Sequence, residues 1–93
     1  MTDFTIVIPV FNESKNIKLL VDRINNLKMN KNFNILFIND GSTDDTWATI
    51  KSLNEKDNKI KGISFSRNFG HQIALSAGID NVEGKFLIMM DGD

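Results

Sequence analysis

The sequence predicts an α/β fold of the order βαβαβαβ, with parallel strands and helices on both faces of one sheet. Two observations support this prediction. Short runs of β-branched and other apolar residues alternate three times with segments whose apolar residues recur at helical spacing, and a last apolar run ends the series. Helical connections of this kind join parallel strands with right-handed crossovers.

The first strand–helix unit is predicted close to the start of the chain. Residues 5–11 form a β-branched run typical of a strand buried on both faces, and Pro9 is expected near its end because proline cannot donate to a ladder. Asn12 or Ser14 is suited to cap the helix that follows. The apolar face of this helix is predicted to comprise Ile17, Leu20, Val21, Ile24 and Leu27.

A second unit follows a polar connector at residues 28–32. Residues 33–39 are predicted to form a strand, and residues 40–44 a turn that leads into a helix. Ser42 and Asp45 have the spacing of a capping box for that helix. Its inner face is predicted to contain Trp47, Ile50 and Leu53.

The third unit and the last strand have weaker patterns. Residues 60–66 are predicted to form a strand that Gly62 weakens, and residues 71–81 a helix with small residues on one face. The apolar run at residues 86–90 is interpreted as a buried strand. At an edge of the sheet it would instead expose apolar surface and invite aggregation.

Composition excludes several classes of protein. The 93 residues can form at most one small domain, and a net charge of −1 without a basic run argues against a nucleic-acid partner. With no cysteine, a disulfide framework is impossible, which fits a cytoplasmic location. No apolar run approaches the roughly 20 residues of a membrane span, so we expect no membrane segment in this chain. Neither a dinucleotide-binding glycine motif nor a P-loop is present.

Polar residues follow each of the four predicted strands, where ligands bind in parallel α/β sheets. Asp91-Gly92-Asp93 offers two carboxylates that suit Mg²⁺ or Mn²⁺ on a diphosphate, although such a segment is also a common polar turn. Asp40 could accept a bond from a ribose hydroxyl or a base N–H, or could serve the turn alone.

The other strand ends carry a cation and an aromatic ring. Arg67 could hold a phosphate or stack on a base, with a surface ion pair as the alternative. Phe11, at the end of the first strand, could stack on a base. His71 is the single histidine, and a solvated position in the first turn of a helix is favoured over a role as catalytic base.

Four segments carry a resemblance to a known family. They are IVIPVFNE at residues 6–13, NDGSTDDT at 39–46, SRNFGH at 66–71 and MDGD at 90–93. In order and spacing they resemble the family 2 glycosyltransferases. The third segment is most similar to the polyprenyl-phosphate branch, which includes bactoprenol glucosyltransferases and dolichyl-phosphate mannosyltransferases.

The resemblance implies a Rossmann-like GT-A fold and an inverting transfer from a UDP- or GDP-sugar. Asp40 would contact the base, and Asp91 with Asp93 would bind Mg²⁺ or Mn²⁺. Asn39 stands where the family usually has a further aspartate. The residues that the resemblance assigns to the nucleotide-sugar site are Pro9, Phe11, Glu13, Asp40, Arg67, Asn68 and Asp91.

The resemblance also implies that residues 1–93 are the incomplete, nucleotide-sugar-binding part of a longer enzyme that works at the cytoplasmic face of a membrane. We expect no catalytic residue within this chain and no transfer by the chain alone. A polyprenyl phosphate acceptor needs no strong base, because the second pKa of a phosphomonoester is about 6. A hydroxyl acceptor on a polysaccharide or glycan stays open, as does a non-catalytic nucleotide-binding module or an inactive remnant.

Overall fold

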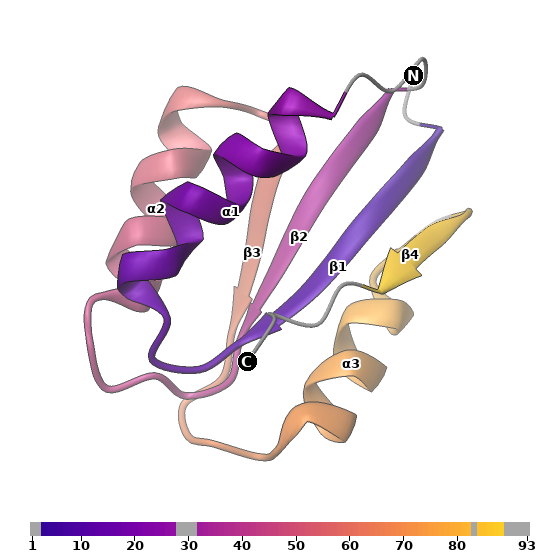
Figure 1. Cartoon of the computed structure of the whole chain (residues 1–93). Coiled ribbons are helices and arrows are strands. Elements are labelled where there is room, and N and C mark those ends of the chain that lie inside the picture. The colour runs from indigo at the N-terminus through magenta and orange to yellow at the C-terminus, as the bar shows by residue number, and fades with distance from the viewer. Residues whose placement is uncertain (1–2, 28–31, 83, 89–93) are drawn as a thin grey trace.

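Four parallel strands form one sheet in the order β3-β2-β1-β4, and three helices connect them (Figure 1). The computed structural model describes residues 3–27, 32–82 and 84–88. The predicted alternation of strands and helices is confirmed. The elements are β1 (Phe4–Val10), α1 (Ser14–Asn26), β2 (Phe33–Asn39), α2 (Thr46–Lys56), β3 (Ile60–Ser64), α3 (His71–Asp80) and β4 (Phe86–Ile88).

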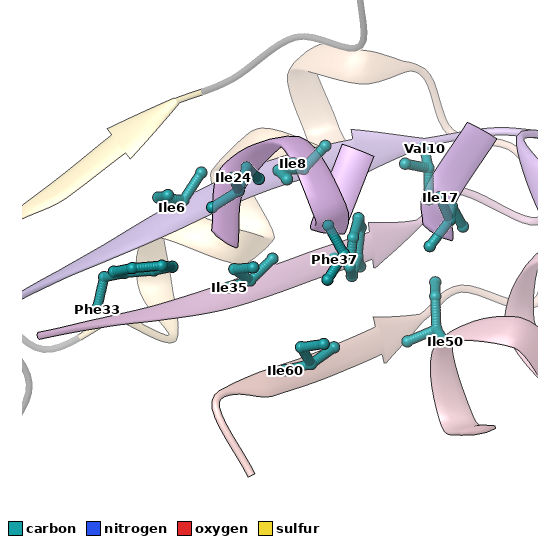
Figure 2. Close-up of a cluster of buried hydrophobic side chains, with 11 residues drawn as sticks. Ile6, Ile8, Val10, Ile17, Ile24, Phe33, Ile35, Phe37, Ile50 and Ile60 are labelled. Carbon is teal, nitrogen blue, oxygen red and sulfur yellow. The ribbon is translucent and has the colours of Figure 1, made fainter. Parts of the chain in front are cut away.

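The two central strands are buried on both faces, which explains their nearly continuous apolar sequences. Helices α1 and α2 cover one face, and α3 covers the other (Figure 1). Alternate residues of β1 and β2 therefore enter two separate cores. The larger core, drawn in Figure 2, contains Ile6, Ile8, Val10, Ile17, Val21, Ile24, Phe33, Ile35, Phe37, Ile50 and Ile60. The smaller core beside α3 contains Val7, Leu36, Ile38 and Ala74.

The helix faces agree with the predicted periodicity, but the predicted caps are wrong. Ile17, Val21 and Ile24 are buried, whereas Leu27 lies past the end of α1 and is exposed. Helix α1 starts at Ser14 and no side chain caps it, and α2 starts at Thr46, one residue past the predicted capping box. The polar side chains of these turns form hydrogen bonds with neighbouring loops instead, because the strands that precede those loops are adjacent in the sheet.

The prediction that the last apolar run forms a buried strand is also wrong. Strand β4 is one of the two edge strands of the described sheet, and the exposed fractions of Phe86, Leu87 and Ile88 are 39%, 56% and 45%. It pairs with β1 alone, through residues 5–7. In the part of the chain that the structure describes, no helix is long and apolar enough to cross a membrane.

Gly62 allows α2 to approach β3 closely. A Cβ atom at this position would lie 2.7 Å from Cγ2 of Ile50 and 2.8 Å from Cζ3 of Trp47. Both distances are too short for non-bonded carbon atoms. Glycine has a low strand propensity, but the close packing of α2 against β3 requires it at position 62.

We expect Gly62→Val to lower the free energy of unfolding by about 1–3 kcal/mol, the usual cost of overpacking, despite the β-propensity of valine. Urea denaturation followed by circular dichroism measures this. Lys61→Val, at an exposed position of the same strand, is the matched control and should change stability by less than about 0.5 kcal/mol. Equal stability of the two variants would contradict the packing argument.

Candidate functional site

The first three polar clusters predicted from the sequence lie at one edge of the sheet. The loops that follow β1, β2 and β3 meet at the carboxyl ends of these strands, at the lower end of the view in Figure 1. Strand β4 runs parallel to β1, toward the same edge. Asp91 and Asp93 lie outside the described residues, as does the side chain of His71.

Asn12 joins the loop after β1 to the loop after β2. Its backbone N–H donates to Oγ of Ser42 at 2.9 Å, and its Oδ1 accepts the N–H of Thr43 at 2.8 Å. The residue has a φ of 53°, in the left-handed region that asparagine tolerates better than most residues. Next to it, the N–H of Glu13 donates to Oγ1 of Thr46 at 2.9 Å. Two loops that are more than 25 residues apart are thereby held as one unit.

Sequence reasoning treated Asn12 as a helix cap and did not foresee this role. Its partners are 30–32 residues away along the chain, so a local pattern could not identify them. The left-handed backbone conformation, which asparagine adopts more readily than most residues, is the feature that marks the position.

The carboxylate of Asp40 holds the loop after β3. The side chain has no exposed surface, Oδ1 accepts the N–H of Phe69 at 2.8 Å, and Oδ2 accepts the N–H of Gly70 at 3.0 Å. The N–H of Asp40 itself donates to the carbonyl of Val10 at 2.9 Å. Asp40 thus connects the ends of three strands. Each oxygen keeps a further lone pair, so the carboxylate can accept another N–H or O–H donor without losing these two bonds.

Gly41 provides the space for this arrangement. It has a φ of +70°, and a Cβ atom would lie 2.1 Å from the carbonyl carbon of Arg67 and 2.3 Å from the N of Asn68. The backbone of the loop after β3 therefore rests directly on the backbone of the turn after β2. Only glycine satisfies both the conformation and the contact.

Arg67 and Asn68 are exposed on the outer surface of this loop. The guanidinium carbon of Arg67 lies 4.8 Å from the ring centroid of Phe69, within the range of a cation–π contact. The ring of Phe69 in turn meets that of Phe65 edge-on, with centroids 5.4 Å apart. Phe69 therefore belongs to the site as the surface on which the arginine rests, a role that sequence reasoning missed.

The residues after β1 differ in exposure. Pro9 is buried in β1 opposite Ile38, so it supports the end of the strand and is not exposed at the surface. Phe11 is 37% exposed and is available for stacking. Glu13 is half-buried, and its Oε2 accepts a bond from Nδ2 of Asn16 at 2.9 Å.

Asp44 closes the turn that leads into α2. Its Oδ1 accepts the N–H of Thr46 at 2.9 Å and also the hydroxyl of Thr46. The hydrogen bond from the Thr46 hydroxyl, reinforced by the backbone bond, holds the pKa of Asp44 below its ordinary value of 3.8. Because the folded-state pKa is depressed, the charged carboxylate stabilises the fold above about pH 4, and this contribution is lost as the pH falls through the folded-state pKa.

Among residues 3–27, 32–82 and 84–88, no three histidine, cysteine, aspartate or glutamate side chains converge as a metal site. The predicted metal pair, Asp91 and Asp93, is outside this part of the chain. Its position is therefore not described, and its role stays a prediction.

Comparison with known proteins identifies the family. Residues 5–93 match the glycosyl transferase family 2, and the chain belongs to this family. It is 43% identical over 91 residues to CsbB of Bacillus subtilis (strain 168), and 38% identical over 91 residues to the bactoprenol glucosyl transferase of Shigella phage SfX. Each alignment covers 96% of this chain but only 28% and 30% of these relatives, so the chain spans less than a third of their length.

Solved structures confirm the predicted GT-A fold. The mannosyltransferase PcManGT from Pyrobaculum calidifontis, solved in complex with GDP-Man and Mn²⁺, matches with a TM-score of 0.81 at 18% identity, over 95% of this chain and 27% of that one. TarS 1–349 from S. aureus matches with a TM-score of 0.80 at 24% identity, over 97% of this chain and 27% of that one.

We expect Gly41→Ala to destabilise the protein well beyond the cost of its backbone conformation. Gly84→Ala is the matched control, because Gly84 also has a positive φ of 85° but an added Cβ would meet nothing within 4 Å. The control should lose about 1–2 kcal/mol of unfolding free energy, and Gly41→Ala at least about 1 kcal/mol more. Equal losses in urea denaturation would show that the contact with the Arg67 backbone is absent.

Asp44→Asn should destabilise the protein at pH 7, because it removes the charge that accepts the two Thr46 bonds. The difference from the wild type should shrink as the pH falls below about 4 and through the lowered folded-state pKa of Asp44, because the wild-type carboxyl then loses its charge as well. Asp45→Asn is the control, because Asp45 makes no side-chain bond at the start of α2. A pH-independent difference in unfolding free energy would refute the assignment.

Proposed function

We propose that residues 1–93 are the donor-binding part of an inverting glycosyltransferase that moves a sugar from a nucleotide-diphosphate sugar to a polyprenyl phosphate. The observation that carries the proposal is the match to the glycosyl transferase family 2 over residues 5–93. The polyprenyl phosphate acceptor is supported by the 38% identity to a bactoprenol glucosyl transferase. A lipid acceptor of this kind would place the whole protein at the cytoplasmic face of a membrane.

The donor nucleotide would bind across the carboxyl ends of β1, β2 and β3. Phe11 offers an exposed ring for the base, and Asn68 and Glu13 offer polar groups in the loops after β3 and β1. The guanidinium of Arg67 is exposed and supported by Phe69, which suits a contact with the diphosphate. Pro9 and Asp40 are buried and would form the base of the donor site, below the exposed side chains. The structural match to PcManGT, which was solved with GDP-Man, supports a nucleotide-sugar donor.

Asp91 and Asp93 are proposed to hold Mg²⁺ or Mn²⁺ against the diphosphate. They follow β4, which runs parallel to β1 toward the edge that carries the other site residues. Paired carboxylates provide the hard oxygen ligands that these cations prefer. When bound, the cation would neutralise charge on the departing nucleoside diphosphate. The presence of Mn²⁺ in the PcManGT complex supports the use of a divalent cation.

A polyprenyl phosphate acceptor would not need a catalytic base from this chain, because its phosphate is already ionised. An oxygen of the polyprenyl phosphate would form a bond to the anomeric carbon as the bond to the nucleoside diphosphate breaks, so that one displacement inverts the configuration. A phosphomonoester is already largely ionised near neutral pH, with a second pKa of about 6. The residues of this chain would then bind and orient the donor, and we expect no transfer of radiolabelled sugar by the chain alone.

Calorimetry should detect binding of UDP or GDP to the 93-residue chain in the presence of Mn²⁺ and at least about tenfold weaker binding in EDTA. The double variant Asp91→Ala, Asp93→Ala should lose this metal dependence because both proposed ligands are gone. Glu55→Ala, Asp80→Ala removes the same charge at exposed positions of α2 and α3 and should bind as the wild type does.

Folded variants are required for the comparison, and circular dichroism verifies this. Metal-dependent binding that survives in the Asp91→Ala, Asp93→Ala variant would refute the metal assignment. Failure of the folded wild-type chain to bind either nucleotide at millimolar concentration would refute the donor-binding proposal.

A further inference from the structure

Phe11 lies between two residues that are each bonded to the segment after β2. The carbonyl of Val10, the residue before it, accepts the N–H of Asp40 at 2.9 Å. The N–H of Asn12, the residue after it, donates to Oγ of Ser42 at 2.9 Å. The ring of Phe11 is 37% exposed, so a ligand can reach it. The place of this exposed ring is therefore set by bonds that its two neighbours make.

The side chain of Asn12 strengthens this attachment. Its Oδ1 accepts the N–H of Thr43 at 2.8 Å, the N–H of Asp44 at 3.3 Å and the hydroxyl of Thr43 at 3.4 Å. These partners are 31 and 32 residues away along the chain, in the turn that leads into α2. One amide oxygen thus binds two consecutive backbone N–H groups of another loop.

The backbone of Asn12 directs the chain between its two neighbours. Its φ of 53° lies in the left-handed region, which asparagine, aspartate and glycine adopt more readily than other residues. Immediately after it, the N–H of Glu13 donates to Oγ1 of Thr46 at 2.9 Å. Asn12 therefore combines a left-handed backbone with a side-chain acceptor, and substitutions can separate these two properties.

We infer that Asn12 is a positioning residue for the donor site: it holds Phe11 in place against the segment after β2, so that the ring is ready to stack on the base. The inference rests on the proposed donor-binding function, and it gives Asn12 no contact with the donor. A ring that is already held in place loses less conformational freedom when a base binds to it. Loss of Asn12 should therefore weaken nucleotides and spare a ligand that has no base.

The first experiment measures by calorimetry the Kd of UDP, GDP and inorganic pyrophosphate, each with Mn²⁺. Asn12→Gly keeps the left-handed backbone and removes Oδ1, so it should raise the Kd of the nucleotides by about tenfold and that of pyrophosphate by less than about twofold. Asn12→Asp keeps the tolerance of this backbone and an acceptor oxygen. It should restore the ratio of the nucleotide Kd to the pyrophosphate Kd to within about twofold of the wild type, because its added charge acts on both ligands.

The second experiment tests whether Asn12 acts through the aromatic ring. In the Phe11→Ala background, Asn12→Gly should raise the nucleotide Kd by less than about twofold, because no ring is left to position. Asn58→Gly is the matched control, since Asn58 is exposed in the turn before β3, at the opposite edge of the sheet. This control should bind all three ligands as the wild type does. Circular dichroism verifies that each variant is folded.

The outcomes separate the inference from the function on which it rests. Unchanged nucleotide Kd values in folded Asn12→Gly, an equal loss for pyrophosphate, a full loss that persists without the ring of Phe11, or no recovery in Asn12→Asp each overturn the inference while donor binding stands. If Asn12→Gly does not fold, Ser42→Ala, which removes the acceptor of the Asn12 N–H, decides by the same cycle. A folded wild type that binds neither nucleotide defeats the proposed function and the inference with it.

Discussion

The buried carboxylate of Asp40 is the constraint on which the arrangement of the site depends. Removing a carboxylate from water costs several kcal/mol unless hydrogen bonds replace the lost solvation. Here two backbone N–H groups at the start of α3 provide that replacement, and the helix dipole adds to it. The end of β2 and the start of α3 cannot separate without leaving this carboxylate unsatisfied, so the two segments are held at a fixed distance.

A second connection, through Asn12, extends this constraint to the loop after β1. Its bonds to Ser42 and Thr43 fix the first loop on the second, and Asp40 fixes the second on the third. Three loops that carry exposed polar and aromatic side chains are thus ordered before any ligand arrives. A ligand that binds to such a surface loses less free energy to the ordering of loops. The helices and the apolar cores act as the support for this edge.

The sequence predicts the elements of this fold better than the contacts between its loops. Burial of Ile17, Val21 and Ile24 follows from helical spacing alone, and the apolar runs of β1 and β2 follow from burial on both faces. The roles of Asn12 and Asp40 could not be predicted locally, because their partners are about 30 residues away. The exposure of Leu87 depends on the absence of a neighbouring strand in the described sheet, which the apolar run itself does not encode.

The inward orientation of Asp40 has a consequence for how a nucleotide diphosphate would be recognised. Both oxygens of Asp40 accept backbone N–H groups, so this carboxylate is engaged with the loop after β3. The single charge of Arg67 does not balance a diphosphate, so further positive charge is needed, and a cation held by Asp91 and Asp93 would provide it. Under the proposed function, the exposed ring of Phe11 and the exposed amide of Asn68 would contribute to the choice of base. Neutral groups of this kind select by stacking and hydrogen bonding, so under the proposed function exchange of Phe11 or Asn68 would alter base preference.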